Sequence, residues 1–230
     1  MFDPVDARPQ PPHWLHRLQV LQADAAQVWT QRVHDLRRHW TRRNPDAPFF
    51  TLGIAAYLDG VDRDPALNNE SVYRSKVLRR HNNQLLQQHF GDLLEHCRVA
   101  IEQWRQQAVR FDPEHTALPG FHIHLPHPVF GDRVASRHND LQFRQAFPTE
   151  QFSDADVMTF TLALSLPKGA GLSLWVDEQE QFHPYHLGEM VLHSGLVTHQ
   201  AILHPHGEPV ARIALQGHAV RRDHTWTLYW

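Results

Sequence analysis

The chain has 230 residues with a formal net charge of -3; 41% of its residues are hydrophobic and 20% are charged. These values are typical of one sizeable globular domain, exclude a disordered or fibrous protein, and offer no basic stripe for a nucleic-acid backbone. No apolar run is long enough to span a membrane, and the first ten residues lack the pattern of a secretory signal. Cys97 is the single cysteine, so an internal disulfide is excluded and a cytoplasmic location is expected.

The N-terminal part of the chain is predicted to begin with an irregular, proline-rich segment at residues 1–12. Between Trp14 and Trp40 apolar residues recur at steps of three and four, which predicts one amphipathic helix that ends before Pro45. Residues 49–58 are aromatic, apolar and closed by a turn signal, which predicts a strand.

A second helix is predicted over residues 72–109. Its apolar stripe includes Cys97, which we therefore interpret as a small core residue rather than a nucleophile. Arg79 and Arg80 are expected on the solvated face of this helix.

After Asp112 short segments alternate with Pro, Gly and Asp turns, which predicts a barrel or a double-sheet jelly roll. Residues 204–207 are expected to form an exposed turn. We predict an α+β architecture in which residues 1–112 form a helical region with one strand, and this region covers one sheet of a β core at 113–230 as one integrated domain. The predicted strands of the core are 120–125, 137–144, 156–166, 171–177, 190–193, 196–203, 210–219 and 225–229.

The strand predicted at 156–166 has two different faces. Strand alternation places bulky residues on one face, and Thr159, Thr161 and Ala163 on the other. A face of small residues leaves room for a ligand inside a β roll, and it also permits a close contact between two sheets. The sequence leaves both interpretations open.

A His-x-Asp pair is the first candidate metal-binding feature. Strand alternation would put His138, Asp140 and Gln142 on one face, where an imidazole and a carboxylate can converge on one cation. Twenty histidines make such pairs common by chance, but His199 follows downstream in a second predicted strand. Two histidines and one carboxylate form the facial triad of non-haem iron(II) oxygenases, which leaves coordination positions open.

Arg212 lies in an otherwise apolar predicted strand beyond these residues. A buried guanidinium is costly without an anion, so this arginine requires a carboxylate partner or a bound acid. The far carboxylate of a 2-oxo acid chelated at the metal would accept two parallel hydrogen bonds from it.

The ordered set His138-x-Asp140, His199 and Arg212, within residues 115–220, resembles the iron(II)/2-oxoglutarate-dependent dioxygenase family. The resemblance implies a double-stranded β-helix (a cupin-like jelly roll) with N-terminal helices packed on one sheet. It implies Fe(II) at the triad, 2-oxoglutarate and O2 as cosubstrates, and release of succinate and CO2, usually with hydroxylation of an unactivated C–H bond. Related halogenases lack the carboxylate ligand, so Asp140 disfavours halogenation.

One position departs from that family. Many members carry a serine or threonine two residues after the arginine, where this chain has Ala214. Thr159 or Thr161 could supply a hydroxyl to the cosubstrate instead. Gln142 is expected to orient the 2-oxo acid or the substrate, and His218 to form a hydrogen bond near the site or to lie in the core.

Two other features have competing interpretations. His122-x-His124 resembles the start of a cupin site, but the positions where a glutamate would be needed hold Pro128 and Val129. The two histidines are therefore expected to be surface or structural residues. Trp175 is expected either to line the substrate entrance or to pack in its strand.

Two alternative functions stay open: a cupin-like metal enzyme that uses no 2-oxo acid, and a non-catalytic β-roll binding module. For the oxygenase the expected partner is a small molecule or an amino-acid or peptidyl substrate, with no nucleic acid and no membrane. The sequence leaves open the identity of the substrate, the pathway and the oligomeric state, a homodimer included.

Overall fold

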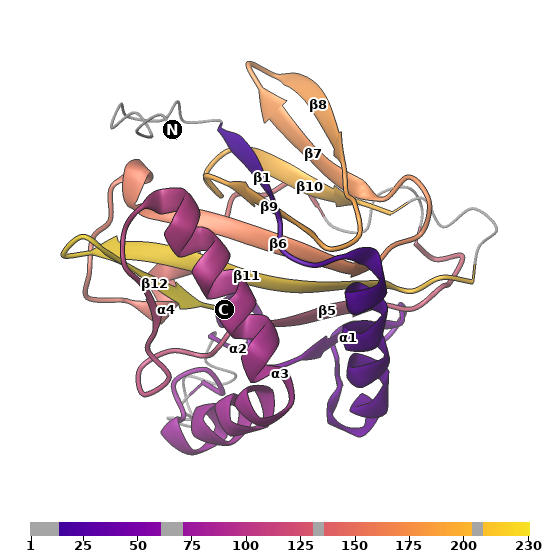
Figure 1. Ribbon diagram of the computed structural model, residues 1–230, viewed down its shortest axis with the longest axis horizontal. Helices are drawn as coiled ribbons and strands as arrows, with labels where there is room; N and C mark the ends of the chain where they lie inside the picture. Colours follow the sequence, from indigo (N-terminus) through magenta and orange to yellow (C-terminus); the bar gives the residue numbers. More distant parts are fainter. Residues whose placement is uncertain (1–13, 61–70, 131–135, 204–208) are drawn as a thin grey trace.

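Two β-sheets form the centre of the computed structural model, which describes residues 14–60, 71–130, 136–203 and 209–230 (Figure 1). The strands of the nine-stranded sheet are β1 (Leu15–Gln19), β2 (Thr41–Arg42), β3 (Phe49–Leu52), β4 (Val109–Phe111), β5 (Gly120–His124), β6 (Val157–Ser165), β9 (Glu189–His193), β11 (Arg212–Arg222) and β12 (Thr225–Tyr229). Their order is β1-β9-β6-β11-β5-β3-β2, with β12 paired to β11 and to β4. Within the described residues the strand pairs of this sheet are antiparallel, except that β4 and β12 are parallel.

The smaller sheet has three antiparallel strands in the order β10-β7-β8. They are β7 (Gly171–Val176), β8 (Gln179–Pro184) and β10 (Thr198–Ile202). Leu172 and Leu174 of β7 share a buried cluster with Ala163 of β6 and Val191 of β9. This cluster joins the two sheets face to face, so the chain has a jelly-roll-like arrangement.

The helices of the N-terminal half pack on the larger sheet (Figure 1). Ala26 and Val33 of α1, Phe90 of α3, and Phe121 and Phe160 of the sheet belong to one buried cluster. None of the helices in the described residues is both long and apolar enough to cross a bilayer. The helical segments are α1 (Ala23–Asp35), η1 (Arg37–His39), α2 (Ala56–Asp59), α3 (Lys76–Arg105), α4 (Phe143–Ala146) and η3 (Asp154–Asp156).

The alternation of β6 determines which side of the larger sheet holds the cavity. Phe160 and Leu162 lie in the cluster shared with α1 and α3, whereas Ala163 lies in the cluster shared with the smaller sheet. Thr159 and Thr161 therefore face the space between the sheets, because alternate residues of a strand point to one side. Both interpretations of this small-residue face hold, each for a different residue. Ala163 makes a close contact with the smaller sheet, and Thr161 lines a cavity between the sheets.

The prediction of one helix from Trp14 to Trp40 is wrong at its start. Residues Leu15–Gln19 form β1, which pairs with β9, and α1 begins only at Ala23. The backbone carbonyl of Gly188 accepts hydrogen bonds from the amides of Val20 and Leu21, which follow β1. The backbone of this segment thus has its hydrogen-bond partners far along the chain. The spacing of apolar residues along the sequence does not reveal this strand pairing.

Two strand predictions also need correction. The strand expected at 49–58 ends at Leu52, and α2 follows at Ala56–Asp59 because Asp59 accepts the amide of Ala55 and pairs with Arg43. Strand β8 was not predicted, since it is mostly exposed and polar and lacks apolar alternation. The other predicted core strands each overlap an observed strand, except 137–144.

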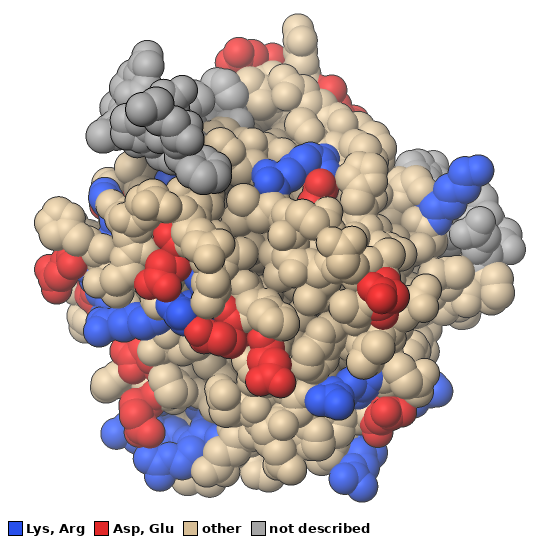
Figure 2. Space-filling view, in the orientation of Figure 1, with Lys and Arg blue, Asp and Glu red and all other residues tan. Residues whose placement is uncertain are grey.

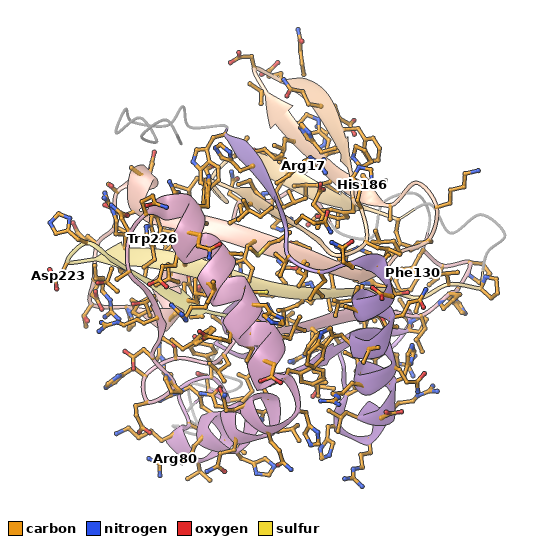
Figure 3. The ribbon with its side chains drawn as sticks, in the orientation of Figure 1. Arg17, Arg80, Phe130, His186, Asp223 and Trp226 are labelled. Atoms are coloured by element: carbon orange, nitrogen blue, oxygen red, sulfur yellow. The ribbon has the colours of Figure 1, made fainter. Side chains whose placement is uncertain are left out.

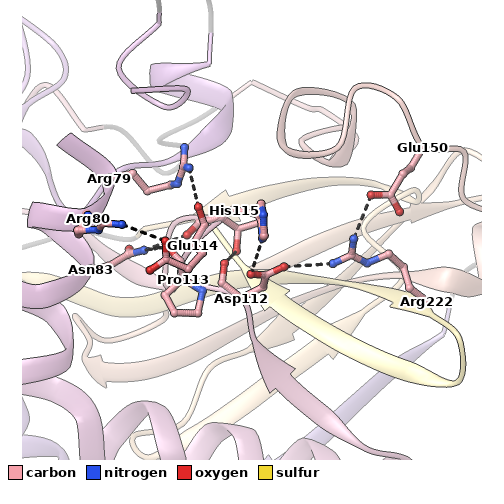
Figure 4. A network of polar contacts seen from close by, with 10 residues as sticks. Arg79, Arg80, Asn83, Asp112, Pro113, Glu114, His115, Glu150 and Arg222 are labelled. Carbon is pink, nitrogen blue, oxygen red and sulfur yellow. Dashed lines mark hydrogen bonds and ion pairs between the residues drawn. The ribbon is translucent and has the colours of Figure 1, made fainter. Parts of the chain in front are cut away.

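The expectation that Arg79 and Arg80 both lie on a solvated face is wrong for Arg79. It is 6% exposed and donates hydrogen bonds to the carbonyls of Tyr73 and Arg74. It also donates to the carbonyl of Glu114 (Figure 4). Arg80, one residue on, is exposed and pairs with the Glu114 carboxylate. Arg79 therefore ties α3 to the segment that precedes β5.

The surface that carries α1 and α3 has acidic and basic side chains interspersed, without a patch of one sign (Figure 2). The β11–β12 hairpin lies at one edge, with Asp223 at its tip (Figure 3). Asp223 and His224 both have positive φ, 48° and 62°. Two such residues in succession form a tight turn whose twist matches that of the paired strands.

Candidate metal centre

Three side chains that are distant in the sequence meet between the sheets. One ligand atom from each of His138, Asp140 and His199 lies within 4.8 Å of the others. Nε2 of His138 is 3.6 Å from Oδ1 of Asp140, and Nε2 of His199 is 3.3 Å from Oδ2. Asp140 and His199 are buried, and His138 is partly exposed. The structure therefore brings together all three predicted ligands.

The strand expected at 137–144 is wrong. His138 forms only an isolated antiparallel bridge with His199, in which each amide donates to the other's carbonyl at 3.0 and 2.9 Å. The Asp140 amide then bonds to the Gly195 carbonyl at 2.7 Å, and the chain turns into α4. Phe143 packs there against an aromatic cluster under β12, so burial of this ring competes with continued strand pairing.

The two histidines present the nitrogen that a metal needs. Nδ1 of His138 contacts the carbonyl of Ser136, and Nδ1 of His199 contacts the carbonyl of Val197, both at 2.8 Å. A carbonyl only accepts, so Nδ1 carries the proton in each ring and Nε2 keeps its lone pair in the neutral form. Metal-binding histidines are usually held in this way.

The carboxylate of Asp140 is held on both sides. Gln142 donates to Oδ1 at 2.9 Å, and Thr159 donates to Oδ2 at 2.6 Å. Burial raises the pKa of Asp140, but the charge of His199 and its hydrogen bond outweigh burial and hold the pKa well below its usual value. Burial lowers the pKa of His199, but the charge of Asp140, its hydrogen bond and the Val197 carbonyl together raise the pKa above its usual value. A divalent cation would replace the proton shared by this pair.

Gly195 makes this close approach feasible. It has a φ of +70°, and a Cβ there would lie 2.6 Å from Oγ1 of Thr159 and 3.2 Å from Cβ of Asp140. A side chain would push both residues apart. The role of Gly195 was not predicted, since a glycine before a candidate ligand is a weak signal without the contacts.

A cavity of about 150 Å³ extends from the triad between the sheets. Among its described lining residues, Asp140 and Arg212 are the charged ones, and Thr161 and Gln142 also line it. Thr159 and His218 do not line the cavity. They lie behind Asp140, so the structure does not place them against the space available to a ligand.

Arg212 begins β11 and is 2% exposed. Within the described residues its guanidinium has no ion pair, and its Nε has no hydrogen-bond partner. Its charged group lies 5.6 Å from the ring centre of Tyr185 and shares a hydrogen bond with that residue. A buried cation with no protein anion is arranged to receive one from a ligand.

Hydroxyl groups lie beside Arg212 although Ala214 supplies none. Tyr185 forms side-chain hydrogen bonds with Thr161 and Arg212, and all three line the cavity. Burial raises the pKa of Tyr185, so its hydroxyl stays protonated and can donate. Tyr185 was not predicted, because it lies in the connection after β8, where no sequence motif marks it.

His122 and His124 are not surface residues. Both are buried and line the same cavity, and His124 lies opposite Arg212 in the ladder between β5 and β11. His122 bonds to the hydroxyl of Tyr57 at 2.6 Å and to Gln216. Burial, helped by Arg212, lowers the pKa of His122 to about 3, so this ring is a neutral part of the wall.

Two other residues considered in the sequence, Trp175 and Cys97, do not line this cavity. Trp175 lines a separate cavity of about 210 Å³, and the guanidinium of Arg137 lies 4.0 Å from its ring. Cys97 is buried in the main core, and burial raises its pKa to about 12, as expected for a core thiol. The turn expected at residues 204–207 lies outside the described residues.

No protein-family model matches the chain, and no curated protein matches its sequence. Among solved structures, an N-substituted L-amino acid dioxygenase from Burkholderia ambifaria is 9% identical over 94% of this chain and 86% of that chain, with a TM-score of 0.62. The same enzyme in complex with alpha-ketoglutarate gives 0.61. A prolyl-4-hydroxylase from Pseudomonas putida is 15% identical over 91% of this chain and 94% of that chain, with a TM-score of 0.43. The likeness to the Burkholderia enzyme supports the jelly-roll-like part of the expected fold.

Proposed function

We propose that this protein is an iron(II)/2-oxoglutarate-dependent oxygenase, most simply a hydroxylase. The observation that carries the proposal is one cavity that joins a His-Asp-His triad to a buried arginine, Arg212, for which the described residues supply no ion pair. The fold shared with the Burkholderia dioxygenase supports it.

The triad fits Fe(II). His138, Asp140 and His199 would bind it with two neutral Nε2 atoms and one carboxylate oxygen, and three positions would stay open. Both other ring nitrogens donate to backbone carbonyls, as such ligands require. Bound Fe(II), with 2-oxoglutarate and O2, would supply the oxidising power that yields succinate, CO2 and an oxidised C–H bond.

The other end of the cavity fits a dicarboxylic acid. Arg212 would donate to the far carboxylate of 2-oxoglutarate, with one hydroxyl of the hydrogen-bonded pair Tyr185 and Thr161 as a further donor. This hydroxyl would replace the one that Ala214 lacks. Gln142, which holds Asp140 and lines the cavity, would fix the side of the carboxylate that faces the cosubstrate.

The other side chains that line the cavity would orient the bound molecules. Phe49, Tyr57, His122 and Leu172 line the cavity with aromatic, apolar and neutral polar surface. These groups would exclude water and leave the charge of the bound acid to Arg212 and the metal. The substrate is proposed to be a small molecule or an amino-acid or peptidyl group that enters beside this wall.

The test is an anaerobic titration of the metal-free protein with Fe(II), with and without 2-oxoglutarate. We expect a weak visible charge-transfer band that needs both, and O2-dependent succinate release. Asp140→Ala and His199→Ala should lose the band, because two remaining ligands hold iron poorly. Cys97→Ser, a change outside the cavity, is the control and should keep it.

Two outcomes would contradict the proposal. Fe(II) binding that is indifferent to 2-oxoglutarate would indicate a cupin-like metal enzyme without this cosubstrate. Absence of Fe(II) binding in the folded wild-type protein would indicate a non-catalytic module.

A further inference from the structure

Three buried polar side chains form a row across the larger sheet behind Asp140. Thr159 of β6 lies opposite His193 of β9 in one ladder and opposite His218 of β11 in the other. All three are at most 2% exposed. Residues directly opposite each other in antiparallel strands point to the same face of a sheet, so all three side chains of the row point from the larger sheet toward the metal centre.

The direction of the hydrogen bonds in this row follows from the donors available. A carboxylate that binds a metal is deprotonated and only accepts, so the 2.6 Å contact with Oδ2 of Asp140 uses the single proton of the Thr159 hydroxyl. The 3.0 Å contact between Oγ1 of Thr159 and Nδ1 of His218 must then be donated by His218. Nε2 of His218 is left as a bare nitrogen, and it has no partner in the described residues.

The other end of the row holds the backbone of the same aspartate. The amide of Gly195 donates to Nδ1 of His193 at 3.1 Å, and the carbonyl of Gly195 accepts the Asp140 amide at 2.7 Å. The row thus fixes the position of Asp140 through His193 and its carboxylate through Thr159.

We propose that His218 is a positioning residue for the metal centre: its Nδ1–H holds the Thr159 hydroxyl in the orientation that donates to Asp140. A threonine hydroxyl rotates freely about its C–O bond unless its lone pairs are also engaged. With His218 in place the hydroxyl proton can point only to Oδ2, which would hold the carboxylate of Asp140 in one orientation for a metal ion. The inference needs the triad to bind a metal and does not need 2-oxoglutarate.

The test uses substitutions that separate the two ring nitrogens. The amide of an asparagine at 218 lies where Nδ1 lies, whereas that of a glutamine reaches the position of Nε2. His218→Asn should therefore keep the hydrogen bond to Thr159, and His218→Gln and His218→Leu should lose it. Thr159→Val removes the hydroxyl itself while keeping the shape of the side chain.

The measurement is the dissociation constant for Mn(II), by calorimetry on the metal-free protein. We expect Thr159→Val, His218→Gln and His218→Leu each to weaken Mn(II) binding about tenfold, and His218→Asn to stay within about threefold of wild type. The double variant His218→Gln/Thr159→Val should bind Mn(II) as Thr159→Val alone does, since both changes break one chain.

Additive losses in the double variant, or equal losses for His218→Asn and His218→Gln, would overturn the inference. So would wild-type Mn(II) affinity in His218→Gln, and that result would leave the proposed function untouched. A different result would contradict the proposed function, namely a wild-type protein that binds Mn(II) or Fe(II) but does not bind 2-oxoglutarate.

Discussion

At the scale of single residues, the candidate site is defined by buried charges and polar groups that the described residues satisfy only in part. Arg212 is the clearest case, since its buried charge faces the cavity and the described residues provide no anion. Burying a charge in this way costs several kcal/mol unless a ligand compensates. The stability of the metal-free protein is therefore lowered by the arrangement that would bind the cosubstrate.

Replacing Arg212 should separate cosubstrate binding from metal binding. Arg212→Ala removes a charge-assisted, two-pronged hydrogen bond and should raise the dissociation constant for 2-oxoglutarate roughly 100-fold, with Mn(II) affinity nearly unchanged. Arg212→Lys keeps the charge without the planar fork and should fall between. Calorimetry of 2-oxoglutarate binding to the Mn(II)-loaded protein measures this, and an unchanged constant would remove Arg212 from the site.

Replacing Gly195 should change both the stability of the protein and the metal affinity of the site. Gly195→Ala places a Cβ at a φ of +70° and 2.6 Å from Oγ1 of Thr159. We expect the free energy of unfolding to fall by about 2 kcal/mol or more, and Mn(II) binding to weaken. In Gly91→Ala, the matched control in α3, the new Cβ meets only the flexible end of Gln87, and stability should rise by about 0.5–1 kcal/mol. Urea unfolding with equal losses in both variants would contradict the strain at Gly195.

At the scale of elements, the site depends on contacts between segments that are short by themselves. A single bridge between His138 and His199 brings two proposed ligands together, with their ring centres 4.4 Å apart. The ladders β9-β6-β11 supply the row beneath Asp140. Helix α3 packs on the opposite face of the larger sheet, where the ring centres of Phe90 and Phe121 of β5 are 4.4 Å apart.

The attachment of α3 can be tested with two adjacent arginines. Arg79→Met removes hydrogen bonds to three backbone carbonyls at a buried position, and should lower the free energy of unfolding by roughly 2–4 kcal/mol. Arg80→Met breaks an exposed ion pair with Glu114 and should change it by less than about 0.5 kcal/mol. Chemical denaturation of both variants measures the difference. Similar values for the two would show that Arg79 does not anchor the helix.

At the scale of the whole molecule, the space between the sheets is kept polar but nearly uncharged. His122, His124, His193 and His218 are buried there, and burial lowers the pKa of each. All four are therefore neutral in the folded protein near pH 7, so the field in the cavity comes mainly from Asp140, Arg212 and a bound metal.

This arrangement predicts that acid destabilises the metal-free protein. A histidine with a lowered folded pKa contributes its full stability above its unfolded pKa of about 6.5, and loses it as the pH falls toward the folded value, which is about 3 for His122. Each such group adds a slope of up to about 1.4 kcal/mol per pH unit in that window. The pKa of His199 is raised, so its contribution to stability grows as the pH falls. This single group opposes the four buried histidines whose pKa values are lowered.

The measurement is the urea midpoint in the presence of a chelator at about pH 7.5 and about pH 5.5, within the window set by these pKa shifts. We expect a lower midpoint at the lower pH and little change between about pH 7.5 and 8.5. An equal midpoint at pH 7.5 and 5.5 would contradict the neutral, buried state of the four histidines.

The sequence by itself determined the features that depend on local pattern or on the chemistry of one side chain. Alternation and turn residues placed most strands of the second half, and the apolar stripe placed Cys97 in the core. His138, Asp140, His199 and Arg212 were found because few residue types can bind a metal or a dicarboxylate, and the structure brings them to one cavity.

Only the tertiary structure decided what depends on a partner far along the chain. The segment Leu15–Gln19 fits a helical period, yet pairing with β9 makes it a strand. Residues 137–144 alternate as a strand would, yet one bridge to β10 and the turn at Gly195 hold the ligands instead. Tyr185 and the direction of each imidazole proton likewise follow from neighbours on other strands. Hydrogen bonds and burial are set by these distant neighbours, and a local sequence pattern does not contain them.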